Sequence, residues 1–140
     1  MKKLLCLLAL TCALLQVHAQ SPASASQSPV EVLSDTTGAN IMPYIKNMMS
    51  DLRARWVSLV AGEAQKSPTR QDETVISFTI APDGHLLAMK LVSSTHNDAV
   101  NRAAWNAIRG ATFAATPSGM KDPDLSLRIR FVINAHPDHF

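Results

Sequence analysis

Cysteine is scarce in this sequence, and both copies lie close to its start. Cys6 and Cys12 are the two cysteines among the 140 residues. A domain that follows them without any cysteine forms no disulfide, offers no thiol nucleophile and cannot build a cysteine-ligated metal site. Its stability must therefore come from an apolar core.

The sequence also lacks an apolar run long enough to cross a membrane. The run of Leu4–Leu15 is about a dozen residues long, whereas a transmembrane helix needs roughly 20 residues. Two lysines precede the run, and Val17–Ala19 places small residues before a cleavage point, as in a signal peptide. We predict that residues 1–19 are a signal peptide cleaved before Gln20. An uncleaved N-terminal anchor and a lipid-modified Cys12 are the alternatives.

Neither sign of charge is in excess once that segment is removed. The full sequence has 13 Lys and Arg residues against 11 Asp and Glu residues, and the two lysines at its start account for the difference. The exported chain would therefore carry no formal net charge. Without a basic excess, the sequence does not indicate nucleic-acid binding.

Catalytic motifs are missing as well. The sequence contains no glycine–serine–glycine nucleophile elbow and no glycine-rich phosphate loop. His85 and His96 are expected in a turn and a loop, and the terminal segment 136–139 has two histidines but no third metal ligand nearby. Asp72 and Glu73 should form a solvated strand entry, because adjacent residues of an extended chain point to opposite faces. We therefore predict no enzyme activity, no catalytic residue, no metal and no cofactor.

Hydrophobic periodicity divides the rest of the chain into five elements. Apolar residues at three- and four-residue steps predict helices, and alternation of apolar and polar residues predicts strands. Asn40 is the expected N-cap of the first helix, Pro43 fits its first turn, and Gly62 is expected to end it. The turn of Pro82–Gly84 joins the first two strands. The predicted elements are a helix over 41–60, strands over 76–81 and 86–92, a helix over 98–111 and a strand over 125–133.

A segment without large apolar residues precedes these elements. Residues 20–29 read QSPASASQSP, a composition that is typical of a flexible tether. We predict a tether over 20–36, a folded domain over 37–134 and a tail over 135–140. Within the tether, residues 30–33 could pair as an edge segment of a sheet.

The last predicted strand has one apolar face and one polar face. Leu125, Leu127, Ile129, Phe131 and Ile133 alternate with Ser126, Arg128, Arg130 and Val132. Such alternation is typical of an antiparallel sheet that is covered on one side. We predict an α+β fold in which two helices cover one face of a three-stranded antiparallel sheet.

With these elements in order, the chain resembles the C-terminal domain of TonB-family energy transducers, whose shape is related to that of the TolA domain. The resemblance covers roughly residues 37–134. It rests on Tyr44 and Trp56, Pro82–Gly84, Leu91–Ser94, Arg102–Trp105 with Ile108, and an altered aromatic-to-proline exit over Phe113–Pro117. The order of strand, PDG turn, strand, paired serines, helix and exit over one contiguous stretch is moderately specific.

The resemblance implies a periplasmic, non-enzymatic module in TonB-dependent transmembrane transport. Such a domain captures an extended segment of an envelope protein, such as an outer-membrane transporter, by adding it to an exposed sheet edge. By resemblance, the expected edge strand is Leu125, Ser126, Leu127, Arg128, Ile129, Arg130, Phe131, Val132 and Ile133. A homodimer through edge strands is a further expectation.

Two alternatives remain open. An uncleaved N-terminal segment would anchor the domain to the inner membrane. The polar segment of residues 20–29, however, would reach only about 35 Å when fully extended, so we expect the binding module without the family's energy coupling. A cell-wall or small-ligand binder of the same fold would need Trp56 or Trp105 at the surface.

Overall fold

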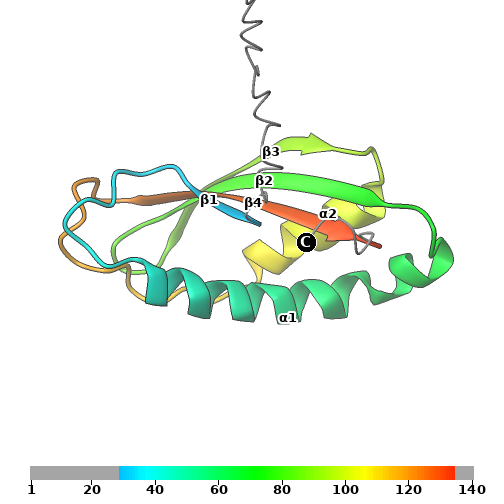
Figure 1. The fold of residues 1–140 in the computed structure, drawn as a ribbon, viewed down its shortest axis with the longest axis horizontal. Coiled ribbons are helices and arrows are strands. Elements are labelled where there is room, and N and C mark those ends of the chain that lie inside the picture. The colour runs from blue at the N-terminus through cyan, green and yellow to red at the C-terminus, as the bar shows by residue number, and fades with distance from the viewer. Residues whose placement is uncertain (1–28, 135–140) are drawn as a thin grey trace, which may run out of the picture.

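The computed structural model describes residues 29–134, and these form a sheet covered by two helices (Figure 1). The predicted signal peptide, the first part of the predicted tether and the predicted tail lie outside the described residues. The elements, in order, are β1 (Val30–Val32), α1 (Met42–Lys66), β2 (Asp72–Ile80), β3 (Leu86–Ser94), α2 (Asp98–Arg109) and β4 (Leu125–Ile133). None of the helices between residues 29 and 134 combines the length and the apolar character that a membrane crossing requires.

The sheet has four antiparallel strands in the order β1-β4-β2-β3. The α+β prediction is confirmed, but the strand count of three was one too low, because residues 30–32 of the predicted tether pair with β4. The weaker expectation of an edge segment at residues 30–33 was therefore the better one. β2 pairs along its whole length with β4, from Asp72 opposite Ile133 to Ile80 opposite Leu125.

One face of the sheet is buried and the other is open. Every second residue of β2 and β4 is buried, starting with the first residue of each strand. The two helices lie on that buried face (Figure 1), and their apolar residues join those of the strands in one core cluster. Trp56 of α1 packs against Phe131 of β4 in a tilted arrangement, with ring centroids 5.0 Å apart and an angle of 54° between the ring planes. Both helices cover one face, as the alternation predicted.

α1 is longer than its sequence signals indicated. Its first residue is Met42, and its N-cap is Ile41, which makes no side-chain capping bond, so the prediction of Asn40 as N-cap was wrong by one residue. Pro43 lies in the first turn as predicted. The helix continues past Gly62 to Lys66, because a single glycine lowers helix stability by only about 1 kcal/mol.

The β2–β3 hairpin closes at the predicted turn. Gly84 has φ +91°, and a Cβ atom at this position would lie 2.4 Å from the carbonyl oxygen of Phe113. Only glycine combines this conformation with such close backbone contact. The amide of Thr116 also donates to the carbonyl of Pro82 at 3.0 Å. The turn and the exit after α2, two parts of the sequence signature, therefore pack directly against each other.

Candidate partner-binding edges

β4 lies inside the sheet and not at its edge. β2 pairs with one side of it, and β1 pairs with the other, through Val30 opposite Ile129, Glu31 opposite Arg128 and Val32 opposite Leu127. The prediction that Leu125–Ile133 is an exposed edge strand was therefore wrong. The alternation that located the strand is the same for an edge strand and an interior one, so it could not distinguish them.

The sheet has two edge strands among residues 29–134, the three-residue β1 and the nine-residue β3, and β3 therefore presents the longer unpaired edge. The amide of Thr95 donates to the carbonyl of Glu73, and the amide of Ala81 donates to the carbonyl of His85, so the odd-numbered residues of β2 face β3. Lys90, opposite Ser77, therefore pairs with β2. Because backbone groups alternate along a strand, the flanking residues Met89 and Leu91 direct their N–H and C=O groups away from β2.

Three exposed apolar side chains accompany this edge. Leu87 is 56% exposed, and Leu91 and Val92 are each 44% exposed. Leu87 and Val92 are the extra residues where the β2–β3 register shifts, between Thr79 and Ile80 and between Val75 and Ile76. Bulges of this kind re-aim side chains and shorten the regular part of an edge. The segment open to pairing is therefore about four residues long, from Ala88 to Leu91.

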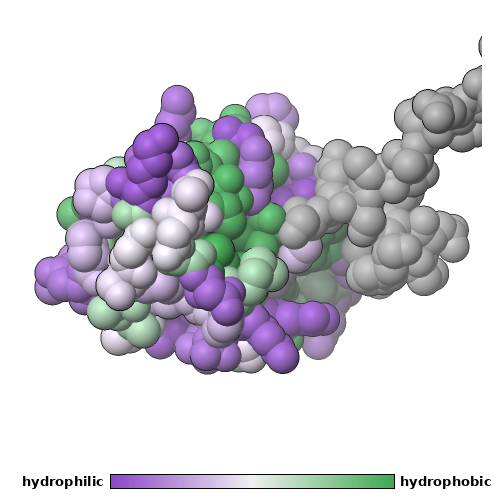
Figure 2. All heavy atoms as spheres, turned by 60° about the vertical axis from the view of Figure 1, so that its left-hand side comes forward, coloured by the Kyte–Doolittle hydropathy of each residue, from purple (hydrophilic) through white to green (hydrophobic). Residues whose placement is uncertain are grey.

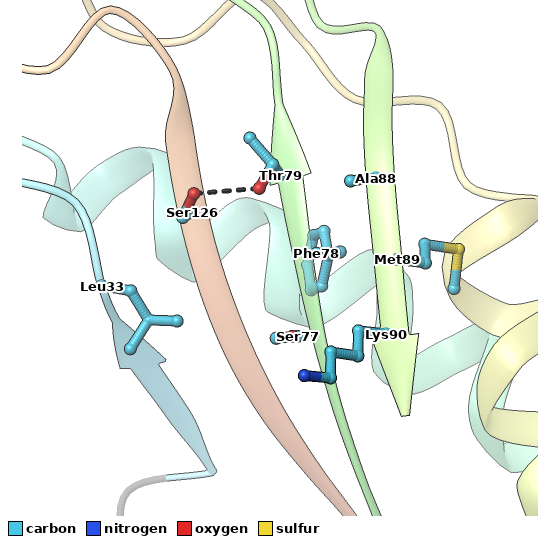
Figure 3. A pocket seen from close by; sticks show the side chains of 8 residues that line it. All are labelled: Leu33, Ser77, Phe78, Thr79, Ala88, Met89, Lys90 and Ser126. Carbon is cyan, nitrogen blue, oxygen red and sulfur yellow. Dashed lines mark hydrogen bonds between the residues drawn. The ribbon is translucent and has the colours of Figure 1, made fainter. Parts of the chain in front are cut away.

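The open face of the sheet carries a shallow hollow of about 160 Å³ (Figure 3). Side chains from all four strands or their ends contribute to it, with Leu33 on one side and Lys90 on the other, and Thr79 and Ser126 share a hydrogen bond of 2.9 Å at its floor. Pockets for small ligands usually measure roughly 300–1,000 Å³. This hollow is too small and open to enclose such a ligand.

Hydrophobic residues also reach the surface elsewhere. Figure 2 shows the end of the domain that carries the β2–β3 turn and the loop after β1, where a strip of hydrophobic residues lies between hydrophilic flanks. Val32 and Leu33 are among the exposed large hydrophobic residues. The exposed apolar surface therefore includes both margins of the sheet.

A buried carboxylate lies at the start of β2. Asp72 is only 2% exposed, accepts hydrogen bonds from Asn97 at 2.8 Å and Thr95 at 2.9 Å, and pairs with Arg70 at 3.1 Å. Burial by itself raises the pKa of Asp72, but the hydrogen bonds from Asn97 and Thr95 and the charge of Arg70 together outweigh it, and the net shift of the pKa is downward. The expectation of a solvated Asp72 was wrong, because these three side chains enclose it.

Asp72 connects the sheet to the start of α2. Asn97, which donates to Asp72, is the N-cap of α2 and accepts from the amides of Ala99 and Val100. Glu73 points to the opposite face, as predicted, where it pairs with Arg130 at 2.5 Å. The two adjacent carboxylates therefore do not meet.

The histidines have local roles. His85 donates its backbone amide to Asp83, and its ring pairs with the same carboxylate at 2.9 Å. These backbone and side-chain bonds lower the pKa of Asp83. His96 lies in the loop before α2 with φ 64°. The part of the chain that the structure describes contains no group of three or more His, Cys, Asp or Glu residues that could hold a metal ion.

Neither tryptophan is fully exposed. Trp56 is 7% exposed and belongs to the core. Trp105 is half-buried and packs against the same core. Tyr44, another residue of the signature, is half-buried on α1, where burial raises the pKa of its hydroxyl, and it donates to the carbonyl of Ala114 at 3.0 Å. The signature aromatic residues therefore hold the fold together.

The chain is similar to proteins of one bacterial family. The family model described as the Gram-negative bacterial TonB protein C-terminal matches residues 63–133. The chain is also similar to the Helicobacter pylori TonB C-terminal domain, residues 179–285 of that protein, whose solution structure is known. The two sequences are 24% identical. The match covers 70% of this chain and 94% of that domain, with a TM-score of 0.47. No curated protein matches the chain.

Proposed function

Since the chain belongs to the TonB C-terminal family, we propose that it is a non-enzymatic, periplasmic protein-interaction module. It binds an extended segment of an envelope protein, such as an outer-membrane transporter, by adding that segment to the β3 edge. In this proposal the β3 edge replaces the β4 edge that the sequence suggested, because β4 is paired on both sides.

The unpaired margin of β3 is the observation that supports this proposal. The outward N–H and C=O groups of Met89 and Leu91 can pair with any extended backbone, whatever its side chains. The exposed Leu87, Leu91 and Val92 supply apolar contacts that backbone pairing alone does not provide. Among residues 29–134 no strand pairs with the outer side of β3, and most residues of β3 are exposed.

A photo-crosslinking residue that replaces Leu87 tests the proposal. The same residue in place of Leu59 serves as the control. Leu59 is a suitable control because it is 49% exposed on α1, away from the sheet edge. In periplasm and envelope fractions we expect a discrete crosslinked protein from Leu87 and none from Leu59. Equal products from both positions would show non-specific contact and would contradict strand addition.

A proline substitution then tests the backbone pairing itself. Leu91→Pro removes an outward N–H, and proline is tolerated on edge strands where the N–H faces solvent. We expect this change to abolish the crosslink from Leu87 while the thermal midpoint changes by only a few degrees. Lys90→Pro, which removes an N–H directed at β2, is the matched control and should destabilise the domain. An undiminished crosslink in the Leu91→Pro variant would refute binding at β3.

The cell-wall or small-ligand alternative depended on an exposed tryptophan. Trp56 is buried and Trp105 is partly buried, which leaves little tryptophan surface for such a ligand. The hollow on the open face is also shallow. Strand addition is therefore the function that the geometry supports best.

A further inference from the structure

A small groove lies on the helical side of the domain, between α1 and the segment of residues 111–114 that follows α2. Its volume is about 140 Å³. Met48 and Leu52 of α1 and Phe113 of the segment give it an apolar floor, and Met48 and Leu52 are only 7% and 1% exposed. Within residues 29–134 the lining comes from α1 and residues 111–114 alone. The groove is therefore a different surface from the β3 edge.

The wall that residues 111–114 form is held in place by contacts with two other elements. The ring of Phe113 stacks on that of Phe78 in β2, with the centroids 5.7 Å apart. The hydroxyl of Tyr44 in α1 donates to the carbonyl of Ala114 at 3.0 Å. The groove is therefore formed before any ligand arrives, and a ligand does not have to order it.

Polar side chains without a partner surround the mouth of the groove. Asn47, Asp51 and Thr112 line it, and all three residues are exposed. Within residues 29–134 none of these three side chains makes a hydrogen bond or an ion pair. Arg55, one turn further along α1, directs its guanidinium to the end of α2, where it would lie 3.5 Å from a Cβ atom on Gly110. Among the described residues, the carboxylate of Asp51 therefore has no counter-charge.

An apolar floor with a carboxylate at its mouth suits a short chain of methylene groups that ends in a cation. The methylene groups leave water against the floor, while the charged end stays at the surface beside Asp51. A volume of about 140 Å³ is the space of roughly five water molecules at about 30 Å³ each. The side chain of lysine has about that many non-hydrogen atoms, whereas the side chain of arginine is longer and ends in a planar group.

We infer that this groove binds a lysine side chain of a partner protein. The methylene groups lie on Met48 and Leu52, and the ammonium group pairs with Asp51. An ammonium group has three donors, and Asn47 and Thr112 supply acceptors for the other two. That the lysine belongs to a protein rests on the proposed function, whereas the preference of the groove for an aliphatic ammonium group does not.

An NMR titration of the full chain with Nα-acetyl-lysine methylamide tests the groove. We expect saturable shifts of the amide signals of Asp51, Thr112 and Phe113, with those of Met89 and Leu91 in β3 unchanged. The same probe acetylated at Nε is neutral and too large for the groove, so it should give no saturable shift. Shifts of the groove signals by both probes, by neither probe, or only in β3 would each overturn the inference.

A charge substitution tests the role of Asp51. Asp51→Asn keeps the size of the side chain and should weaken binding of the lysine probe about three- to fivefold, the range expected for an exposed ion pair. Asp98→Asn, at an exposed carboxylate on α2 outside the groove, is the matched control and should not change binding. Thermal melts of both variants confirm that they are folded. Unchanged binding to Asp51→Asn, or an equal loss in both variants, would overturn the inference.

Butylammonium, which has the lysine side chain without the peptide groups, tests the source of the ligand. It should bind no more tightly than the lysine probe. Tighter binding would assign the groove to a free amine and would overturn the choice of a protein lysine. The two proposals can fail separately, because the absence of a crosslink from Leu87 counts against strand addition alone and the absence of groove shifts counts against the lysine site alone.

Discussion

Individual side chains close the junction between the sheet and α2, and Asp72 is the most consequential of them. Its carboxylate accepts from Asn97 and Thr95 and pairs with Arg70. Removing its charge weakens all three contacts and leaves the hydrogen-bond donors of Asn97 and Thr95 poorly satisfied. We expect Asp72→Asn to reduce the free energy of unfolding at pH 7 by about 1–3 kcal/mol, measured by urea denaturation. Asp51→Asn, a change on the exposed side of α1, should leave it within about 0.5 kcal/mol.

The same carboxylate gives the stability a pH dependence with a definite sign. Because the pKa of Asp72 is lowered in the folded state, its ionised form stabilises the fold at neutral pH. That contribution is lost as the pH falls through the folded-state pKa. The difference in unfolding free energy between the wild type and Asp72→Asn should therefore shrink as the pH is lowered from 7 to below 4. A constant difference over this range would show that the charge of Asp72 does not matter.

Replacing a glycine by alanine should have opposite effects on stability at two positions, Gly62 in α1 and Gly84 in the β2–β3 turn. Gly62 lies inside α1, and a Cβ atom there would meet nothing within 4 Å. Gly62→Ala should stabilise the domain by about 0.5–1 kcal/mol, raising the thermal midpoint by roughly 2–6 °C. Gly84→Ala should destabilise it, because its φ is +91° and the new Cβ would clash with the Phe113 carbonyl. Circular dichroism melts of the two variants check both signs, and a fall in the midpoint of Gly62→Ala would contradict the first.

The strands and helices were largely predictable from periodicity, but the edges of the sheet were not. Residues 125–133 were located correctly because their alternation is uninterrupted. The residues of β1 were predicted to belong to a tether, because three residues are too few to show an alternation of apolar and polar side chains and the segment before them is polar. The order of strands in the sheet depends on contacts between distant segments, such as Glu31 with Arg128, which local patterns do not encode. The strand over residues 125–133 was therefore predicted correctly, but its position at the edge of the sheet was not.

The candidate site shows the same limit. The PDG turn and the strand over residues 86–92 could be predicted from the sequence, but the two bulges at Leu87 and Val92 depend on the register with β2. The burial of Asp72 depends on Asn97 and Thr95, which follow it by more than 20 residues. Neither the bulges nor the burial of Asp72 could be predicted from the residues of a single strand or helix, because both depend on contacts with other elements.

At the scale of the whole molecule, a single core joins both helices to one face of the sheet. α1 packs on α2 and reaches the sheet mainly at β4. Trp56 provides part of that contact, because its ring packs against the ring of Phe131 with the centroids 5.0 Å apart. A domain of this size has little apolar area in reserve, so the loss of one large core side chain should affect every element together.

Trp56→Ala tests whether the domain unfolds as one unit. We expect a loss of about 3–5 kcal/mol, which is a large share of the roughly 5–15 kcal/mol that holds a typical domain together. Urea unfolding followed by far-UV circular dichroism and by the fluorescence of Trp105 should give coincident transitions at a lower midpoint, because α1 has no core of its own. Val57→Ala, at a 56% exposed neighbour on the same helix, is the control and should change stability by less than about 0.5 kcal/mol. Separate transitions for the two signals would mean that α1 melts independently of the sheet, and the covered face could then not be treated as one cooperative core.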